Sequence, residues 1–464
     1  MHRFSIAVCL ALVACGGGDD QNGHLADAPL LIDGPNPDAP VQPAPPVTLT
    51  ITSNGMPVPG VTVYFVNADD SLAAAAQTDA AGTASARIAD GGSVTAVNPF
   101  PAPVVAAAVR NGDDLRTFVG VKPGDHLVLT GALPSVSFTL NAKAVSGAAE
   151  YLVLTSCGSA SIPVATGSSG SGPDPTGSVT LFGCGGTADM LVIARNSDFV
   201  PMSALYHAGA PLTEGGTVDL TGDAYQPVAD LGLGYTNVSP NTGSVSLAYA
   251  LGTGRGVFAP LFNDSAGPVG GTAMFAEQAP SFAGAIGVID TSLRLNSEHH
   301  VIDWAPYTAS YMLDLTSLLL PDMIATPSFN PTTQRVSWTE DVVGAAPDLT
   351  TAALRVTREV PFRSWHWELA APYTPGEIKL PRLPTDVFDW TPTINDAVIV
   401  EHVMNAKLPG RYDAVRAHML DIEDKLDAPG LGVGEQNHAD FVAGASGRVA
   451  LVQFFEPLAL RRAR

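Results

Sequence analysis

Residues able to bind a metal or carry catalysis are sparse in this sequence, and the best spaced of them lie in its C-terminal half. His299-His300-x-x-Asp303 and Glu401-His402 combine imidazole and carboxylate groups, which are common metal ligands. Adjacent residues of a strand point to opposite faces, so His299 and His300 cannot share one ion unless a bulge intervenes. We therefore predict no metal site and no cofactor.

All five tryptophans fall within residues 304–390. Strand alternation places Trp365 and Trp367 on one face, and His366 and Glu368 on the other. One interpretation makes the two indoles part of a buried core. The other leaves them exposed, as a stacking platform for a sugar or peptide ligand. The pattern alone keeps both interpretations open.

Local motifs of nucleophilic catalysis and nucleotide binding are absent from the sequence. There is no G-x-S-x-G elbow, and the glycine-rich stretches 252–256 and 430–434 lack the strand-then-helix setting of a nucleotide fingerprint. The sequence therefore predicts no catalytic residue. A Ser/His/Asp triad assembled only by tertiary structure needs no local motif, so an enzyme stays open as an alternative.

Composition bounds the class of protein. The 464 residues include 46 Gly and 38 Pro, only 15% are charged, and the formal net charge is −22. Nucleic-acid binding requires a basic surface, so this balance excludes it. The length and the frequent turn formers predict several compact domains.

The first fifteen residues have the plan of an export signal. Arg3 precedes an apolar stretch, Phe4 to Val13, which is too short to cross a bilayer as a helix. The stretch ends in Leu12-Val13-Ala14-Cys15, followed by Gly16. This run resembles the lipobox of bacterial lipoproteins, which implies cleavage before Cys15 and acylation of its thiol. The resemblance implies anchoring in the cell envelope. Gly16 favours the outer membrane, on its periplasmic face or at the cell surface.

The segment that follows does not have the composition of a folded domain. Every residue from Gly16 to Pro46 that is charged at pH 7 is an aspartate, and proline is frequent. Such a segment buries too little apolar surface to offset its ordering entropy. We predict a disordered tether over 15–46.

Two cysteines remain once Cys9 leaves with the signal and Cys15 is acylated. Cys157 and Cys184 each stand at the end of a strand-like run. In an oxidising compartment we expect them to form a disulfide with each other.

From Val47 onward the apolar pattern has the period of β-strands. Apolar and other residues alternate over 47–51 and again over 61–65. Turn-forming pairs recur at short intervals, at Asn54-Gly55, Pro59-Gly60, Asn111-Gly112 and Pro123-Gly124. This spacing predicts an all-β chain of tandem Ig-like or β-sandwich modules.

One of these modules carries a recognisable pattern. Residues 54–88 contain Gly55-x-Pro57-Val58-x-Gly60-Val61-x-Val63-x-Phe65, followed by Thr78-Asp79-x-x-Gly82. The pattern resembles carboxypeptidase-regulatory-like and bacterial Ig-like domains, and the domain would span about 47–131. The resemblance implies a sandwich with no catalysis of its own, in which Asp79 and Gly82 shape a hairpin.

A second resemblance lies near the C-terminus, at Phe329-Asn330-Pro331 and Val336-Ser337-Trp338-Thr339. These residues are similar to the B strand of fibronectin type III domains, which implies a core position for Trp338. Apolar residues from Tyr412 to Leu426 follow helical spacing and favour a short helix. The predicted organisation is a signal peptide (1–14), the tether (15–46), and β-rich domains at 47–132, 133–223, 224–320 and 321–464.

The functional expectation combines the anchor, the tether and the modules. It is a lipid-anchored envelope protein with a non-enzymatic binding, adhesion or scaffolding role. Its partners would be the membrane, through the lipid, and a glycan or protein ligand. The alternative is an anchored extracytoplasmic hydrolase acting on polysaccharide or peptide.

Overall fold

The computed structural model describes residues 44–100, 113–131, 135–155, 158–164, 174–182, 186–238, 244–253, 256–258, 261–266, 271–315, 319–385, 389–408, 411–415 and 446–455. All of them belong to the second of two compact units, Ala44–Arg464. The predicted signal peptide, Cys15 and the tether up to residue 43 lie outside the described residues, as do Cys157 and Cys184.

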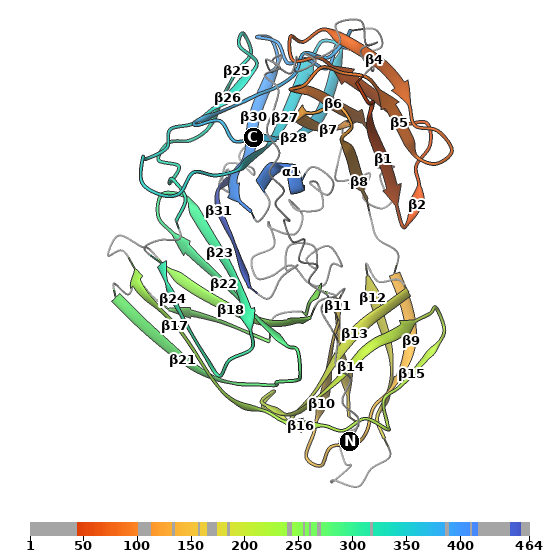
Figure 1. Ribbon diagram of the computed structural model, residues 1–464, viewed down its shortest axis with the longest axis vertical. Helices are drawn as coiled ribbons and strands as arrows, with labels where there is room; N and C mark the ends of the chain where they lie inside the picture. Colours follow the sequence, from red (N-terminus) through yellow and green to blue (C-terminus); the bar gives the residue numbers. More distant parts are fainter. Residues whose placement is uncertain are drawn as a thin grey trace, which may run out of the picture. The chain divides into compact units, whose positions relative to one another are not determined.

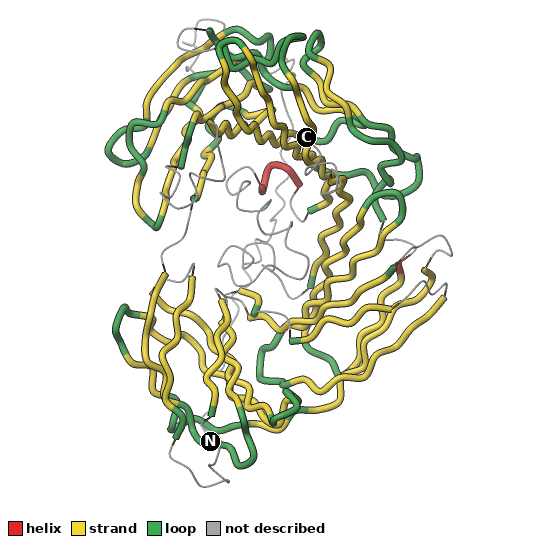
Figure 2. Tube along the Cα trace, turned by 180° about the vertical axis from the view of Figure 1, so that it is seen from behind, coloured by secondary structure: helices red, strands yellow, loops and turns green. Residues whose placement is uncertain are grey.

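The described chain is all-β, as the alternation predicted (Figures 1 and 2). Within the described ranges the strands are accompanied by one α-helix, α1 (Arg411–Val415), which begins where helical spacing was found. The rest of that predicted helix lies outside the described residues. No helix in the described ranges is long and apolar enough to cross a membrane.

The first sandwich comprises two facing sheets. One consists of β1 (Val47–Ser53), β2 (Met56–Pro57), β5 (Thr83–Ala86) and β8 (His126–Thr130). The other contains β3 (Thr62–Val66), β4 (Leu72–Gln77), β6 (Gly92–Val97) and β7 (Asp113–Val121). The predicted inward residues Leu49, Ile51, Val63 and Phe65 are fully buried between them.

The predicted hairpin turn before β5 is present. Asp79 Oδ1 accepts hydrogen bonds from the backbone N–H groups of Ala81 and Thr83, each at 2.9 Å. Gly82 has φ +72°, and a Cβ there would lie 2.4 Å from the Ile51 carbonyl oxygen. Both the backbone conformation and the close approach therefore require glycine at this position.

The second sandwich is built from the residues after 134. Its first sheet contains β9 (Ser135–Asn141), β12 (Thr176–Phe182) and β15 (Thr217–Asp219). Its second contains β10 (Glu150–Thr155), β11 (Gly158–Pro163), β13 (Gly186–Arg195), β14 (Pro201–Leu212) and β16 (Gln226–Pro227). A core cluster that includes Phe138, Val153, Val179 and Val192 fills the space between the two sheets.

The third sandwich has a small sheet of β17 (Ala229–Val238), β21 (Gly271–Ala279) and β24 (Ser310–Asp314). Facing it are β18 (Val245–Thr253), β19 (Gly256–Val257), β20 (Phe262–Ala266), β22 (Ile286–Arg294) and β23 (Glu298–Pro306). Leu231 and Leu233 from the small sheet pack with Leu247 and Ile289 from the other.

The fourth sandwich also pairs a small sheet with a large one. The small sheet is β25 (Ser328–Asn330), β26 (Arg335–Ser337) and β29 (Glu377–Lys379). The large one contains β27 (Leu349–Glu359), β28 (Phe362–Pro372), β30 (Ala397–Lys407) and β31 (Gly447–Phe455). Trp338 is 7% exposed and joins this core, in agreement with its predicted position.

Strand pairing continues across three of the sandwiches. The larger sheets of the third and fourth sandwiches and one sheet of the first form a single 13-stranded sheet (Figure 1). β31 pairs with β23 on one side and β30 on the other, and β28 pairs with β7 in parallel. The sheet hydrogen bonds therefore cross the predicted boundaries near residues 132 and 320.

Candidate functional site

Trp365 and Trp367 do not form a ligand platform. They are 1% and 0% exposed, because the sheet of β25, β26 and β29 covers their face of β28. Trp367 Nε1 donates a hydrogen bond to Thr117 Oγ1 at 2.8 Å, and Trp365 packs edge-on against Trp390. The core interpretation holds, and the alternative of an exposed stacking platform is wrong.

The opposite face of β28 carries a cluster of ionisable side chains drawn from four adjacent strands. We call it the junction cluster, and it consists of Asp114 and Arg116 on β7, Arg355 on β27, His366 and Glu368 on β28, and Glu401 on β30. His366 Nδ1 lies 3.5 Å from Asp114 Oδ1 and 3.4 Å from Glu368 Oε1. Its Nε2 lies 3.2 Å from Glu401 Oε2. Alternation in the sequence had placed only His366 and Glu368 on this face.

Ordinary alternation brings Glu401 to this face. Ile399 pairs with Arg355, which pairs with His366 on its other side, so Glu401, two residues after Ile399, points the same way. A β-bulge lies at Glu401, where the pairing of β27 with β30 steps from Ala353–His402 to Leu354–Val400. Glu401 can therefore reach His366 and also pair with Arg355.

The cluster balances its own charge. Arg116 Nε lies 3.0 Å from Asp114 Oδ2, and its other end pairs with Glu368. Burial acts to lower the pKa of His366, but contacts with Asp114 and Glu401 outweigh it and raise that pKa above its usual value. Three carboxylates thus face two guanidinium groups and one imidazole that favours its charged form. Such a network joins strands and leaves no activated nucleophile.

The adjacent histidines on β23 lie on opposite faces, as strand geometry required. His299 Nε2 lies 3.1 Å from Asp322 Oδ1, and Asp322 also accepts hydrogen bonds from Asn296 and Ser297. Burial acts to raise the pKa of Asp322, but these donors hold it well below its usual range. Ser297 and His299 both bind the carboxylate and not each other, so this set is not a catalytic triad.

His300 points to the other face and contacts two carboxylates. Its Nδ1 lies 3.5 Å from Asp290 Oδ1 and its Nε2 lies 3.1 Å from Glu298 Oε1. Burial opposes the charged imidazole, but the two acidic partners raise the pKa of His300 to about 9. Across the described ranges no group of three or more His, Cys, Asp or Glu side chains is placed to hold a metal ion.

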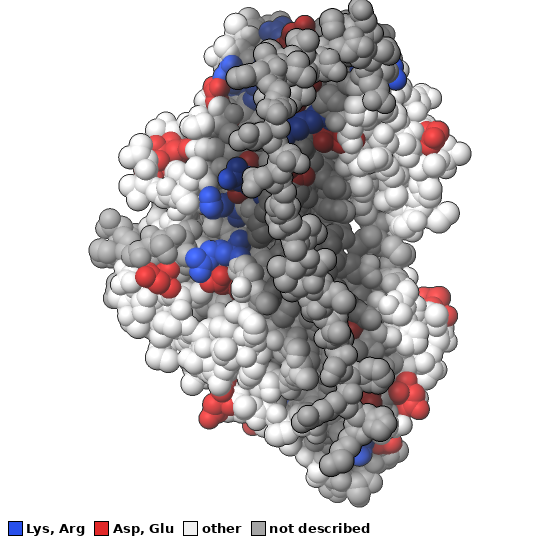
Figure 3. Space-filling view, viewed as in Figure 1, with Lys and Arg blue, Asp and Glu red and all other residues white. Residues whose placement is uncertain are grey.

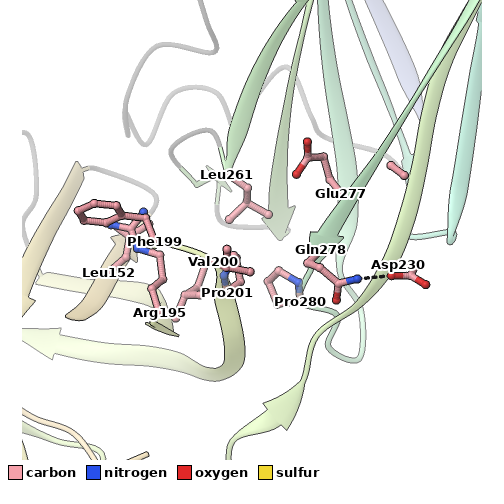
Figure 4. Close-up of a pocket in the computed structure, with 12 residues that line it drawn as sticks. Leu152, Arg195, Phe199, Val200, Pro201, Asp230, Leu261, Glu277, Gln278 and Pro280 are labelled. Carbon is pink, nitrogen blue, oxygen red and sulfur yellow. Dashed lines mark hydrogen bonds between the residues drawn. The ribbon is translucent and has the colours of Figure 1, made fainter. Parts of the chain in front are cut away.

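A cavity of about 310 Å³ lies between the second and third sandwiches (Figure 4). Its lining is mainly apolar with a few polar groups, the usual composition of ligand pockets, and its volume is at the lower end of their range. The second sandwich supplies Leu152, Ile193, Arg195, Phe199, Val200 and Pro201. The third supplies Asp230, Leu261, Ala276, Glu277, Gln278 and Pro280.

Phe199 is the unusual residue of this cavity. Its side chain is 65% exposed, and its backbone has φ +61°, a left-handed conformation that bulky residues rarely adopt. Asn196 fixes the turn by accepting hydrogen bonds from the N–H groups of Asp198 and Val200, each at 2.9 Å. Neither burial nor backbone preference favours phenylalanine here, so its presence calls for another reason.

The charged groups of the cavity are partly paired. Arg195 lies over the Phe199 ring, with its Cζ 5.5 Å from the ring centroid, and donates to Glu150 at 2.8 Å. Asp230 accepts a hydrogen bond from the neutral side-chain amide of Gln278. In Figure 4, Asp230 and Leu261 lie on opposite sides of Gln278. The carboxylate charge of Asp230 is therefore not cancelled by this partner.

A second cavity, of about 410 Å³, touches Trp304, Tyr311, Asp303 and Arg448. Trp304 is only 4% exposed, and Arg448 makes a two-pronged ion pair with Asp303. The charged and aromatic groups here are already engaged within the protein. On the face drawn in Figure 3, Lys and Arg side chains are interspersed with Asp and Glu, and most of the surface formed by described residues is uncharged. The Phe199 cavity is therefore the better candidate site.

Sequence reasoning missed this cavity for a clear reason. Asn196-Ser197-Asp198 marks a turn, but nothing local distinguishes an exposed Phe199 from a core one. The other wall comes from the third sandwich, from Asp230 and then from residues more than sixty positions after Phe199, such as Leu261 and Ala276 to Gln278. Only the packing of the two sandwiches brings these residues together.

No protein-family model matches the chain, and no curated protein matches it either. The resemblances to carboxypeptidase-regulatory-like, fibronectin type III and lipoprotein sequences therefore rest on their motifs alone.

Some solved structures show limited similarity. The Bacillus anthracis TIE protein matches with a TM-score of 0.15 and 10% identity, over 59% of this chain and 50% of its own, so the match spans half of that protein. A putative cell adhesion protein of Bacteroides ovatus matches with a TM-score of 0.13 and 12% identity, over 40% of this chain and 97% of its own. A DUF3823 family protein of the same organism gives 0.12 and 14%, over 34% and 90%. At these scores the similarities support no inference about function.

Proposed function

We propose that this protein is a lipid-anchored envelope protein that binds a ligand without transforming it, and that the Phe199 cavity is the binding site. The observation that carries the proposal is the exposed ring of Phe199, held in a left-handed backbone conformation beside an apolar cavity. An aromatic ring presented in this way offers a large, rigid contact area to a ligand. The role is adhesion or scaffolding at the envelope.

Two further features support the proposal. The run from Leu12 to Cys15 has the residues that lipoprotein acylation requires, and two or more acyl chains hold a protein stably on a membrane. The 13-stranded sheet makes the first, third and fourth sandwiches continuous through backbone hydrogen bonds, which suits a scaffolding role, and the second sandwich, which carries Phe199, lies outside that sheet.

The anchor and the binding site are tested separately on the full chain. Growth with an alkyne-tagged fatty acid should label the wild-type protein and fractionate it with membranes, whereas Cys15→Ser should lose both. Purified protein is then incubated with peptidoglycan, envelope glycans and envelope proteins, using Phe199→Ala as the matched variant. Binding lost in that variant, with no product released, is the expected result.

Other outcomes would reject parts of the proposal. Binding that Phe199→Ala leaves unchanged would place the ligand elsewhere on the protein. Product release from a glycan or peptide would favour the anchored hydrolase instead. A Cys15→Ser protein that keeps its label and its membrane fraction would reject the anchor while leaving the cavity untouched.

A further inference from the structure

The cavity touches a strand with an open edge. β21 is the last strand of its sheet, whose order is β21-β17-β24, and it pairs with no other strand in the described ranges. It is nine residues long, its one charged residue is Glu277, and it contains no Lys, Arg or Pro. Natural edge strands usually carry such residues, or are short, because an open edge templates pairing with another chain. Met274 on this edge strand is 62% exposed.

The backbone groups that β21 presents can be identified from its neighbour. The Gly232 N–H donates to the Ala309 carbonyl oxygen at 2.9 Å, so it points toward β24 and away from β21. Gly232 is opposite Ala276. In an antiparallel ladder both residues of such a pair direct their N–H and C=O groups outward. Ala276, and by the same alternation Met274 and Gln278, therefore present backbone donors and acceptors along the open edge.

The cavity reaches this edge. Ala276, Gln278 and Asp230 of β17 line it from one face of the sheet, and Glu277 lines it although its side chain points to the other face. The cavity therefore covers one face of the sheet and extends around the edge of β21. Figure 4 shows this arrangement, with Leu261, Val200 and Pro201 on one side of Gln278 and Asp230 on the other.

From these placements we infer that the ligand of the Phe199 cavity is an extended peptide, which adds as a strand to the open edge of β21 and inserts one apolar side chain into the cavity. In this mode the main-chain hydrogen bonds supply affinity and the pocket supplies sequence preference. The inference rests on the function proposed above and names its ligand class. A glycan would not use the regular outward N–H and C=O groups of Met274, Ala276 and Gln278.

The chemistry of the site also constrains the peptide. The cavity contacts from Val200, Leu261 and Pro280 accept an aliphatic or aromatic side chain. Asp230 is exposed at the site, and the whole chain carries a formal net charge of −22. Like charges destabilise association, so the peptide is neutral or basic around its apolar residue. It also lacks proline in the paired stretch, since proline cannot donate to a ladder.

The experiment selects peptides from a random library displayed on phage, using the purified full chain as target. An enriched peptide is synthesised with a fluorescent label, together with two versions N-methylated at one or the other alternate set of amides. Titrations use wild type, Ala276→Pro, Ala276→Ser and Phe199→Ala. Proline removes an outward N–H without touching the bonds between β21 and β17, and serine retains that N–H. A thermal melt of each variant reports whether it is folded.

The expected result has a directional pattern. One N-methylated version binds about tenfold more weakly or worse, while the other keeps its affinity, because only alternate amides face β21. Ala276→Pro weakens binding to a similar extent and Ala276→Ser does not. Phe199→Ala weakens binding of the wild-type peptide. N-methylation changes only the peptide, so the comparison of the two N-methylated versions tests strand addition even if the Ala276→Pro variant fails to fold.

Four outcomes overturn the inference. Failure to enrich any peptide rejects the ligand class. Peptides that need Phe199 but tolerate both N-methylated versions reject strand addition, while the proposed binding function survives. Peptides that are insensitive to Phe199→Ala as well reject the cavity, and the proposed function falls with it. Self-association of the full chain that Ala276→Pro abolishes would instead assign the edge to a second copy.

Discussion

His366 Nε2 on β28 lies 3.2 Å from Glu401 Oε2 on β30, across the strand β27 that pairs with both. The same imidazole faces Asp114 on β7, at the point where β7 and β28 pair in parallel. The side chains of the junction cluster therefore reinforce the pairing that joins the first sandwich to the fourth.

Arg116 should be the most sensitive member of that cluster. Its side chain is 10% exposed and neutralises both Asp114 and Glu368. Arg116→Met leaves two buried carboxylates under-compensated, and we expect a loss of about 3 kcal/mol in the free energy of unfolding. Urea denaturation measures this change in the free energy of unfolding. Lys122→Met is the control, since its pair with Asp413 is exposed and should contribute about 0.5 kcal/mol or less. Equal effects of the two substitutions would show that the cluster is not a stabilising junction.

His300 should make the protein less stable at alkaline pH. Its folded pKa is about 9 against an ordinary value of 6.5. Because the folded pKa is raised, the stabilisation is fully present below pH 6.5 and is lost as pH rises through 9. The loss should reach about 2–3 kcal/mol. Unfolding measured from pH 6 to 10 should show this decline, and His300→Gln should flatten it. An NMR titration of the His300 ring with a midpoint near 6.5 would contradict the prediction.

Replacing Phe199 by glycine should stabilise the protein. A non-glycine residue at φ +61° is strained, and the exposed ring gains little from burial. We expect Phe199→Gly to raise the free energy of unfolding by about 0.5–1 kcal/mol. Phe199→Ala retains the strain, so it should be neutral or slightly destabilising. Thermal melts distinguish the two. A glycine variant less stable than wild type would mean that the ring contributes to structure more than to ligand contact.

Trp367 should behave as a core residue. It is fully buried and bonded to Thr117, so Trp367→Ala should lower the free energy of unfolding by about 3–5 kcal/mol. Phe362→Ala, on the same strand but 79% exposed, serves as the control and should change it by about 0.5 kcal/mol or less. Denaturation of both variants provides the test. A stable Trp367→Ala protein would revive the exposed platform.

The cysteine pair stays a prediction that the described neighbours favour. Gly158 lies against Leu181, and a Cβ at Gly158 would be 3.9 Å from the Leu181 Cα. Gly158 directly follows Cys157 in the sequence, and Leu181 stands three residues before Cys184. A disulfide between the two cysteines should stabilise the fold by about 3–4 kcal/mol. Cys157→Ser, Cys184→Ser and the double variant should then lose similar amounts. Quantitative thiol labelling of the unreduced, unfolded protein would contradict the bond.

The sequence allowed parts of the candidate site to be anticipated and not others. Alternation correctly separated Trp367 from His366 and His299 from His300, because side-chain direction along a strand follows from backbone geometry alone. It did not decide whether the tryptophan face was covered, since burial depends on a sheet formed by other residues. It also could not identify Glu401 as a partner of His366, because tertiary structure alone places β27 between β28 and β30.

By itself the sequence determined the all-β class, the strand periods and the turn at Asp79 and Gly82, all of which depend on local sterics and hydrogen bonding. Tertiary structure decided which strand edges meet, as in β7 with β28 and β23 with β31. It also decided that Phe199, Leu261 and the edge of β21 would line one cavity. The physical reason is that every strand edge presents the same backbone N–H and C=O groups. A local sequence pattern therefore does not determine which strand a given edge pairs with, and the packing of the sandwiches decides it.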